Sequence, residues 1–337
     1  MNGASTNSSS IRAAFSYCVQ QVRSYDYHHY LCLLHLSPTM RRAAFALRAF
    51  NVETARAMDV ASDRKIGLMR LLWWQEAIDK IFSNKIIEHP TAQALSSVIS
   101  EHKISKSWLK RSVEARIRDA SREENQIPET IGELEKYAED TVSTLLYTTL
   151  QAGGIRSTAA DHAASHIGKA SGLLLLLKSL PYHASHGGRF SYIPADVASK
   201  HGLLMKQGGR LEILMEPSEA LSNAVFEIAS VANIHLQKAR DLAGSVPSEA
   251  SPFGRWGSGY FSSVVSIEAE LACMEEEVLK MLGLIGDELN FLGFLPEELV
   301  MLLFAISHYL IFGSSSHLTW RSLLPPEYCR SGLTDID

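Results

Sequence analysis

A long apolar stretch between Asp161 and Pro194 constrains the fold of this chain more than any other feature. Its apolar residues recur every three or four positions, which places them on one face of an α-helix. These positions are Ala163, Ile167, Ala170, Leu174 and Leu177. The consecutive leucines at 173–177 leave one turn of that helix without a polar side. A helix that is apolar all round is a buried helix, so the stretch predicts the central helix of an all-α bundle.

Small residues also repeat along this stretch. Ala164, Gly168 and Gly172 are four positions apart and therefore share one face of the helix. A glycine in a helix interior costs about 1 kcal/mol relative to alanine, so two of them need a reason. Their spacing predicts that a second helix approaches this face closely.

The rest of the chain up to about residue 250 also has helical periodicity. Helices are predicted at Thr39–Asp59, Ile66–Phe82, Thr91–Ser100, Ser107–Glu124, Ile131–Gln151 and Pro217–Asp241. A short piece at Phe190–Ile193 is the only segment with the character of an extended strand. After residue 250 a Gly- and Ser-rich linker precedes an apolar run at Leu299–Phe312. That run is shorter than the roughly 20 residues that cross a bilayer, so it predicts a buried or interfacial helix.

Composition excludes several classes of protein. The net charge of −5 provides no basic excess to neutralise phosphates, so we expect no nucleic-acid partner. The four cysteines are scattered without a C-x-x-C pair, which excludes a ribbon-type zinc site and a disulfide framework. The first 16 residues are rich in Ser and Thr, contain Arg12 and lack acidic residues. They are a candidate mitochondrial targeting segment, with a frayed polar tail as the alternative.

The order of segments around the central helix resembles the squalene/phytoene synthase family. The helix is followed by a short polar turn, a Gly-Arg-aromatic triplet and Tyr192-Ile193-Pro194. Members of that family condense two prenyl diphosphates head to head. The resemblance implies an all-α, terpenoid (squalene/phytoene) synthase-like helical bundle around a central cavity. It also implies two aspartate-rich motifs that hold Mg²⁺ through carboxylate oxygens.

The residues at these motif positions do not suit Mg²⁺. The first motif, D-x-x-x-D in the enzymes, falls on Val52–Arg56, where Glu53 is the only carboxylate. Arg56 places a cation where a ligand should stand, and a cation repels Mg²⁺. The positions of the second motif read Ser179, Tyr182 and His183. We therefore expect no metal site, no cofactor and no catalysis, as in a pseudoenzyme.

Other parts of the pattern are retained. Arg42, Tyr137 and Arg189 stand where the family places residues around its diphosphate end. An arginine fork suits phosphate oxygens, so a vestigial cavity for an anion, a lipid or an isoprenoid is one interpretation. The alternative is that the two arginines pair with structural carboxylates and the tyrosine packs in the core. A metal site built from the histidines at 162, 166, 183 and 186 is a weaker hypothesis, because no glutamate or cysteine stands beside them.

Several consecutive motifs resemble one branch of this family more closely, namely the mitochondrial complex I assembly factors with a squalene/phytoene synthase-like domain. They include YDYHHYLCLLHL at 25–36, RRAAFALRAFNVE at 41–53 and IGLMRLLWWQEAIDKIF at 66–82. YAEDTVSTLLY at 137–147 and DHAASHIGKASG at 161–172 belong to the same set.

This resemblance implies a non-catalytic factor that acts on an early membrane-associated subunit of mitochondrial NADH:ubiquinone oxidoreductase. Its expected partners are complex I subunits or other assembly factors. Its expected location is peripheral, on the matrix side of the inner membrane. We expect three regions, which are a targeting segment at 1–16, a synthase-like domain at 17–250 and a divergent helical tail at 251–337. The alternatives are a lipid-binding module and an active prenyltransferase with metal ligands from Glu53, Asp59 and Glu139.

Overall fold

The computed structural model describes residues 3–34, 36, 38–122, 126–185, 192–207, 210–213 and 218–243. These residues all belong to the first of two compact units, Met1–Asn290. The predicted tail therefore lies outside the described residues, together with Arg189, His186 and part of the extended piece at 190–193.

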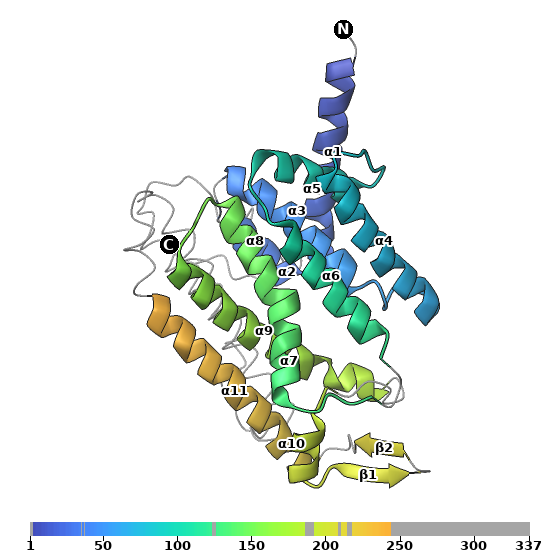
Figure 1. Ribbon diagram of the computed structural model, residues 1–337, viewed down its shortest axis with the longest axis vertical. Coiled ribbons are helices and arrows are strands. Elements are labelled where there is room, and N and C mark those ends of the chain that lie inside the picture. The colour runs from blue at the N-terminus through green and yellow to red at the C-terminus, as the bar shows by residue number, and fades with distance from the viewer. Residues whose placement is uncertain are drawn as a thin grey trace, which may run out of the picture. The chain divides into compact units, whose positions relative to one another are not determined.

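The described residues form an all-α bundle, as predicted (Figure 1). The bundle begins with α1 (Gly3–Tyr25), α2 (Tyr27–Leu34), α3 (Pro38–Ala55), α4 (Arg64–Phe82), α5 (Pro90–Glu101) and α6 (Lys106–Ala120). It continues with α7 (Ile131–Ala138), the π-helical turn η1 (Glu139–Ser143), α8 (Thr144–Ala152) and α9 (Thr158–Ser185). The described part ends with α10 (Ala195–Lys200), β1 (Leu204–Gln207), β2 (Arg210–Ile213) and α11 (Glu219–Ala243).

Local chemistry sets several of the helix starts. The Asp63 carboxylate accepts from the backbone N–H groups of Lys65 and Ile66 at 2.7 and 3.0 Å, which caps α4. Pro90 occupies the first turn of α5, where its missing N–H leaves no bond unmade. Ser157 and Ser218 accept from Ala160 N and Leu221 N, both at 3.2 Å, at the starts of α9 and α11. These caps divide the chain into helices close to those predicted from periodicity.

The predicted close approach to α9 is confirmed, and its partner is the segment around η1. A Cβ atom on Gly168 would lie 2.2 Å from Ser143 Oγ and 2.6 Å from Ser143 Cα. A Cβ atom on Gly172 would lie 2.4 Å from Ala138 Cβ. Real Cβ atoms do not come this near to other heavy atoms, so both positions require glycine.

The buried stripe of α9 is also confirmed, because Ala163, Ile167, Ala170, Leu174 and Leu177 are all buried. The prediction that the leucine run has no outer side is wrong at one position. Leu175 is 46% exposed, although the other four leucines are buried. A helix in a bundle still turns one narrow face outward, and Leu175 lies on that face.

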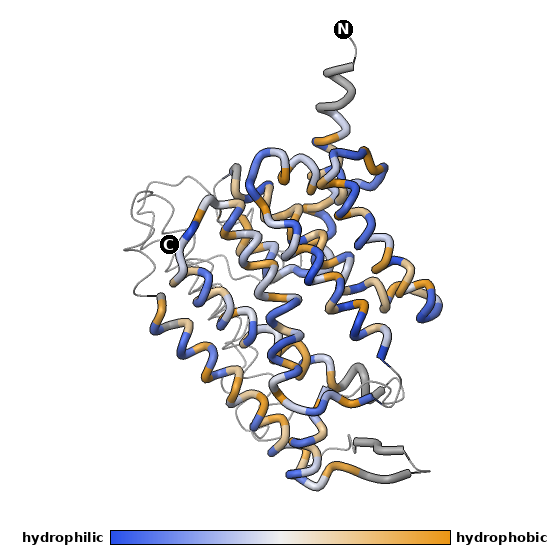
Figure 2. The backbone as a smooth tube through the Cα atoms, in the orientation of Figure 1, coloured by the Kyte–Doolittle hydropathy of each residue, from blue (hydrophilic) through white to orange (hydrophobic). Residues whose placement is uncertain are grey.

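The core of the described region consists mainly of two large hydrophobic clusters. One joins α9 and α11 with α7 and α10, and α9 and α11 run side by side in Figure 1. The other joins α1, α3, α4, α5 and α6, with Phe50 and Ile78 among its buried residues. Hydrophobic and hydrophilic positions alternate along these helices, as expected for elements that each bury one face (Figure 2).

Three local elements differ from the predictions. The first is the hairpin of β1 and β2, which pairs Leu204 with Ile213 although no strand was predicted there. The second is η1, where the helix predicted at 131–151 widens for five residues. The third is α1, which crosses the expected boundary at residue 16 and buries Ala14 beside Cys18 and Val22. A targeting role for the residues that precede Ala14 stays a prediction.

No described helix is both long enough and apolar enough to cross a membrane.

Candidate functional site

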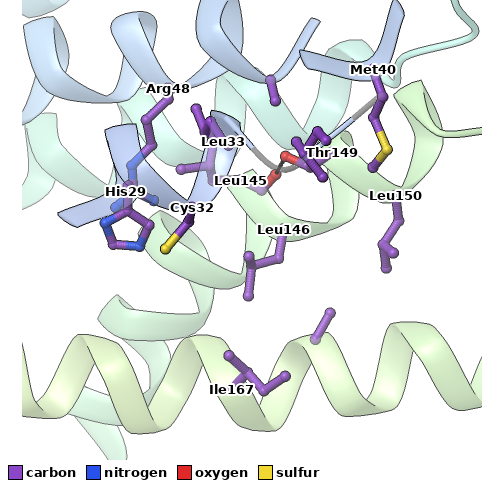
Figure 3. A pocket seen from close by; sticks show the side chains of 13 residues that line it. His29, Cys32, Leu33, Met40, Arg48, Leu145, Leu146, Thr149, Leu150 and Ile167 are labelled. Atoms are coloured by element: carbon purple, nitrogen blue, oxygen red, sulfur yellow. Dashed lines mark hydrogen bonds between the residues drawn. The ribbon is translucent and has the colours of Figure 1, made fainter. Parts of the chain in front are cut away.

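A pocket of about 80 Å³ lies between α2, α3, α8 and α9 (Figure 3). Its wall is mostly apolar. The apolar residues are Leu33, Leu36, Met40, Ala44, Leu145, Leu146, Leu150, Ala164 and Ile167. His29 and Arg48 lie at one end of the pocket in Figure 3, and Met40 and Leu150 lie at the other. The pocket therefore has a mostly apolar wall and a cationic side chain, Arg48, at one end.

A buried ion pair holds the cationic end in place. Arg48 Nε donates to Asp26 Oδ2, and His29 Nδ1 lies 2.8 Å from Asp26 Oδ1. Asp26 stands at the joint between α1 and α2, so this pair ties both helices to α3. The Arg48 guanidinium and His29 lower the pKa of the Asp26 carboxyl far below its usual range, against the opposing effect of burial.

A second buried cation lies near the first. Arg116 of α6 is buried, and its two described partners are uncharged. It donates to Ser112 Oγ and, at 2.8 Å, to Asn51 Oδ1 of α3. Burial lowers the pKa of Arg116, and the positive charge of Arg48 lowers it further. The interior between α3 and α6 thus holds two arginines and one firmly paired carboxylate.

Tyrosines and one ion pair complete this polar region. Burial and the negative charge of Asp119 raise the pKa of Tyr137 to about 12. Tyr192 donates to Asp119 Oδ2 at 3.0 Å, and Arg122 binds the other oxygen of that carboxylate. The charges of Arg116 and Arg122 act on Tyr137 as well, so these groups form one electrostatic cluster.

The structure does not bring Arg42 to this cluster. The Arg42 side chain is half exposed. Its Nη2 atom lies 3.6 Å from Glu101 Oε1, and its guanidinium carbon lies 4.5 Å from the centroid of the Phe15 ring. These contacts are on α5 and α1, whereas Tyr137 interacts with groups around α6. Arg48, which lines the pocket, was not selected from the sequence. The spacing of Arg48 one turn after Ala44 in a helix with an apolar stripe was the available signal.

The first motif does not converge on the cavity as a ligand set. Val52 is buried, and the Arg56 guanidinium lies 3.4 Å from the centroid of the Tyr25 ring. Glu53 points to α1 and α5, where its carboxylate accepts from Thr91 Oγ1 at 2.5 Å and from Tyr17. Glu53 is therefore bound by hydroxyl donors on neighbouring helices.

The positions of the second motif carry no carboxylate. The Ser179 hydroxyl donates to the Leu176 carbonyl of its own helix at 2.6 Å. Tyr182 and His183 are helical positions of α9, and their side chains lie outside the described residues. Within the described ranges, no group of three His, Cys, Asp or Glu side chains could hold a metal ion. The residues present at the two motifs do not fit the Mg²⁺ ions that the resemblance implies.

The alternative ligand set of Glu53, Asp59 and Glu139 does not assemble. Asp59 is exposed after the end of α3. Glu139 accepts from Tyr147, from Ser165 at 2.7 Å and from Ser143 at 3.1 Å, beside α9. Each carboxylate has a separate environment, and no metal-holding group of three is found in the described part of the chain.

His166, one histidine of the hypothesised metal site, contacts a histidine on another helix. His166 pairs with His235 of α11 through their Nδ1 atoms at 2.8 Å, and His235 Nε2 contacts Glu135. His162, one turn away on α9, is exposed. The contacts run in a line from α9 through α11 to α7, so they join three helices and do not converge on a point.

Glu53 and Glu139 allow a prediction on pH. Burial raises the pKa of Glu53 to about 7, so the folded state loses stability as the pH rises from about 4.3 through 7. Glu53→Gln is therefore expected to raise the melting temperature at pH 8 and to leave it unchanged near pH 4. The expected gain is on the order of 1 kcal/mol or more, because one pKa unit corresponds to about 1.4 kcal/mol.

Glu139→Gln is the matched control, with the opposite sign. Hydrogen bonds from Tyr147 and Ser165 and the charge of Lys169 hold the pKa of Glu139 below its usual value, although burial opposes them. Its stabilising effect is present at neutral pH and is lost on acidification. This variant is expected to melt earlier than wild type at pH 7, with the difference narrowing below about pH 4. Parallel pH profiles for the two variants would contradict both assignments.

Comparison with known proteins places these observations in a family. Residues 22–264 match the model of the squalene/phytoene synthase family. A rat protein named NADH dehydrogenase (ubiquinone) complex I, assembly factor 6, is 39% identical over 236 residues, which are 70% of this chain and 68% of the relative. The human protein of that name is 38% identical over the same length. A Dictyostelium discoideum homolog is 34% identical over 241 residues.

Solved structures of distant sequences have the same fold. Squalene synthase HpnC from Alicyclobacillus acidocaldarius superimposes with a TM-score of 0.63 at 16% identity, covering 80% of this chain and 95% of that one. A dehydrosqualene synthase in complex with ligand gives a TM-score of 0.61, also at 16% identity, over 82% and 98% of the two chains. At this identity the likeness concerns the fold alone.

Proposed function

The chain belongs to the squalene/phytoene synthase family, and from that premise we propose that it is a non-catalytic assembly factor of mitochondrial complex I. The observation that carries the proposal is its 38–39% identity, over 70% of its length, to relatives named as complex I assembly factor 6. On this proposal the chain acts in mitochondria, at the matrix face of the inner membrane. It binds complex I subunits or other assembly factors there.

The absence of catalysis is supported by the residues at the family's metal motifs. A prenyl synthase uses Mg²⁺ to neutralise the diphosphate that leaves, which requires carboxylates on two facing helices. Here Val52, Arg56 and Ser179 stand at those positions, and Glu53 is engaged by Thr91 and Tyr17. In this proposal the synthase-like bundle binds other proteins and catalyses no reaction.

A direct assay distinguishes this function from that of an active prenyltransferase. The full chain is incubated with radiolabelled farnesyl diphosphate and geranylgeranyl diphosphate, with and without Mg²⁺. We expect no condensed product and no Mg²⁺-dependent increase in affinity on calorimetric titration. A tenfold tightening, equivalent to about 1.4 kcal/mol, or turnover above a protein-free blank would contradict the pseudoenzyme proposal.

Complementation tests the assembly role itself. In cells that lack the endogenous relative, expression of the full chain is expected to restore complex I activity. Glu53→Gln should rescue equally well, because on this proposal no metal chemistry depends on that carboxylate. Loss of rescue by Glu53→Gln at unchanged protein abundance would indicate a catalytic site, and failure of the wild-type chain would contradict the assembly role.

A second candidate function is binding of a lipid or isoprenoid, which the pocket favours. Its apolar wall suits a hydrocarbon chain, and Arg48 at one end suits an anionic head group. Native mass spectrometry of the protein purified from membranes tests this, and loss of a bound lipid in Leu146→Trp would place it in the pocket.

A further inference from the structure

We propose that the exposed face of α4 is the surface by which this protein docks on an anionic phospholipid bilayer. This inference rests on the proposed function, because that function places the protein at a membrane without assigning a surface. The surface, called here the α4 apolar face, consists of Ile66, Met69, Leu72 and Trp73. All four are large apolar residues that remain exposed in the described part of the bundle.

The burial pattern shows that this face is additional to the core contacts of α4. The opposite side of the helix packs on α5 and α6 and buries Gly67, Leu71, Trp74, Ala77, Ile78 and Ile81. An ordinary surface helix is apolar on the core side and polar on the other. The first half of α4 also carries large apolar residues on its exposed side, with Lys65 and Arg70 among them. Clustered exposed apolar residues mark interaction sites far more often than isolated ones.

Exposure at the centre of the face is large. Met69 is 67% exposed and Leu72 is 45% exposed. The ring centroids of Trp73 and of His89 in the following loop are 5.1 Å apart. Ile86, in the same loop, is 93% exposed. α4 lies at the edge of the bundle in Figure 1, so α5 and α6 cover one side of it.

The charges around the face complement an anionic surface. Lys65, Arg70 and Lys85 are exposed, and none of them forms an ion pair with a described residue. The neighbouring carboxylates are occupied within the protein. Asp63 caps α4, Glu76 pairs with Lys80 at 2.8 Å, and Asp79 binds Lys106 and Lys110. Glu88 in the following loop forms no ion pair with a described residue and offsets part of the positive charge.

This combination favours a lipid bilayer over a protein groove. Interfacial helices carry Trp and aliphatic residues on one face with Lys and Arg beside them, and they bind through apolar burial plus attraction to anionic lipids. Tryptophan prefers the head-group level of a bilayer, where its ring is apolar and its N–H is wet. The α4 apolar face has this composition, and the exposed cations Lys65 and Arg70 belong to the same part of the helix.

The test is flotation of the full chain with vesicles of phosphatidylcholine, with and without phosphatidylglycerol. Met69→Glu/Leu72→Glu is the test variant. Phe226→Glu/Ile234→Glu is the matched control, because these residues of α11 are 59% and 52% exposed and the charge change is identical. We expect binding of wild type only when phosphatidylglycerol is present, a loss of about tenfold or more in the test variant, and wild-type binding in the control. Circular dichroism checks that both variants are folded.

Each outcome is decisive. Equal binding of the test variant and wild type would overturn the α4 assignment and leave the assembly role intact. No binding of wild type to either vesicle would overturn membrane docking altogether. A test variant that binds vesicles normally but fails to restore complex I would assign the face to a protein partner instead. Loss of vesicle binding together with normal rescue would support the docking surface and contradict the need for membrane contact in the proposed function.

Discussion

Replacing Gly168 by leucine is expected to lower the free energy of unfolding by about 3 kcal/mol or more. Overpacking a core costs about 1–3 kcal/mol when flexible side chains can move aside. Here the obstacle includes backbone, because a Cβ atom would lie 2.6 Å from both Ser143 N and Ser143 Cα. Relief requires α9 to separate from η1, and α9 also carries the large cluster shared with α11.

Thermal and urea denaturation of three variants tests this expectation. Gly168→Ala should already be destabilised, since the added atom is the Cβ itself. Gly132→Ala in α7 is the matched control, because its Cβ would meet only Thr130 Oγ1 at an ordinary 3.5 Å. That control should match or slightly exceed wild type, since alanine is the better helix former. Wild-type stability of Gly168→Leu would show that η1 does not pack against α9 as described.

The close contact between α9 and η1 also illustrates how much of the fold can be predicted from the sequence. Ala164, Gly168 and Gly172 recur every four residues and share one face of the helix. Their small side chains indicate that another segment approaches this face closely. They do not indicate which helix approaches. The partner turned out to be a segment that widens into a π-helix at Glu139–Ser143, and such a widening leaves no mark in hydrophobic periodicity.

Exposure is less predictable than periodicity. Leu175 belongs to an unbroken leucine run and is nevertheless 46% exposed. In the same way, Leu72 follows the buried Leu71 in the helix predicted at Ile66–Phe82, yet α4 turns it outward together with Met69. Periodicity shows that a residue is apolar at a given angle on its helix. Which angles another helix covers depends on packing between segments distant in sequence.

The candidate site, too, can be predicted from the sequence only in part. The motif positions Val52, Arg56 and Ser179 could be judged from their chemistry, because Mg²⁺ requires oxygen ligands whatever the fold. The residues that line the pocket, and the polar groups around Arg48, could not be chosen in this way. Asp26 and Arg48 are 22 positions apart, and Arg116 reaches Asn51 across 65 positions. Only the assembled bundle brings these groups together.

The cavity also shows how the interior accommodates its charge. In the enzymes that this chain resembles, carboxylates and Mg²⁺ meet an anionic substrate. Here the buried cations Arg48 and Arg116 lie together, and Asp26 is the carboxylate that pairs with one of them. Asp119 acts on Arg116 electrostatically, whereas among the described residues Asp26 is the carboxylate that binds Arg48 directly.

Asp26→Ala is accordingly expected to cost about 3–5 kcal/mol, which is the usual effect of removing one partner from a buried ion pair. The substitution leaves Arg48 buried without a counterion and next to a second buried cation, Arg116. It also frees the joint between α1 and α2, because the same carboxylate binds His29. Circular dichroism melts at pH 7 measure the effect. Asp79→Ala removes an exposed carboxylate that binds two lysines and should melt close to wild type.

Two further measurements separate the charge effect from loss of packing. The pKa of Asp26 is lowered in the folded state, so its stabilising effect is complete above the usual carboxyl pKa of about 3.9. That effect is lost as the pH falls below this value, so the gap between wild type and Asp26→Ala should narrow on acidification. The double variant Asp26→Leu/Arg48→Met removes both charges and should regain most of the lost stability. If the double variant is as unstable as Asp26→Ala, the stranded arginine is not the cause.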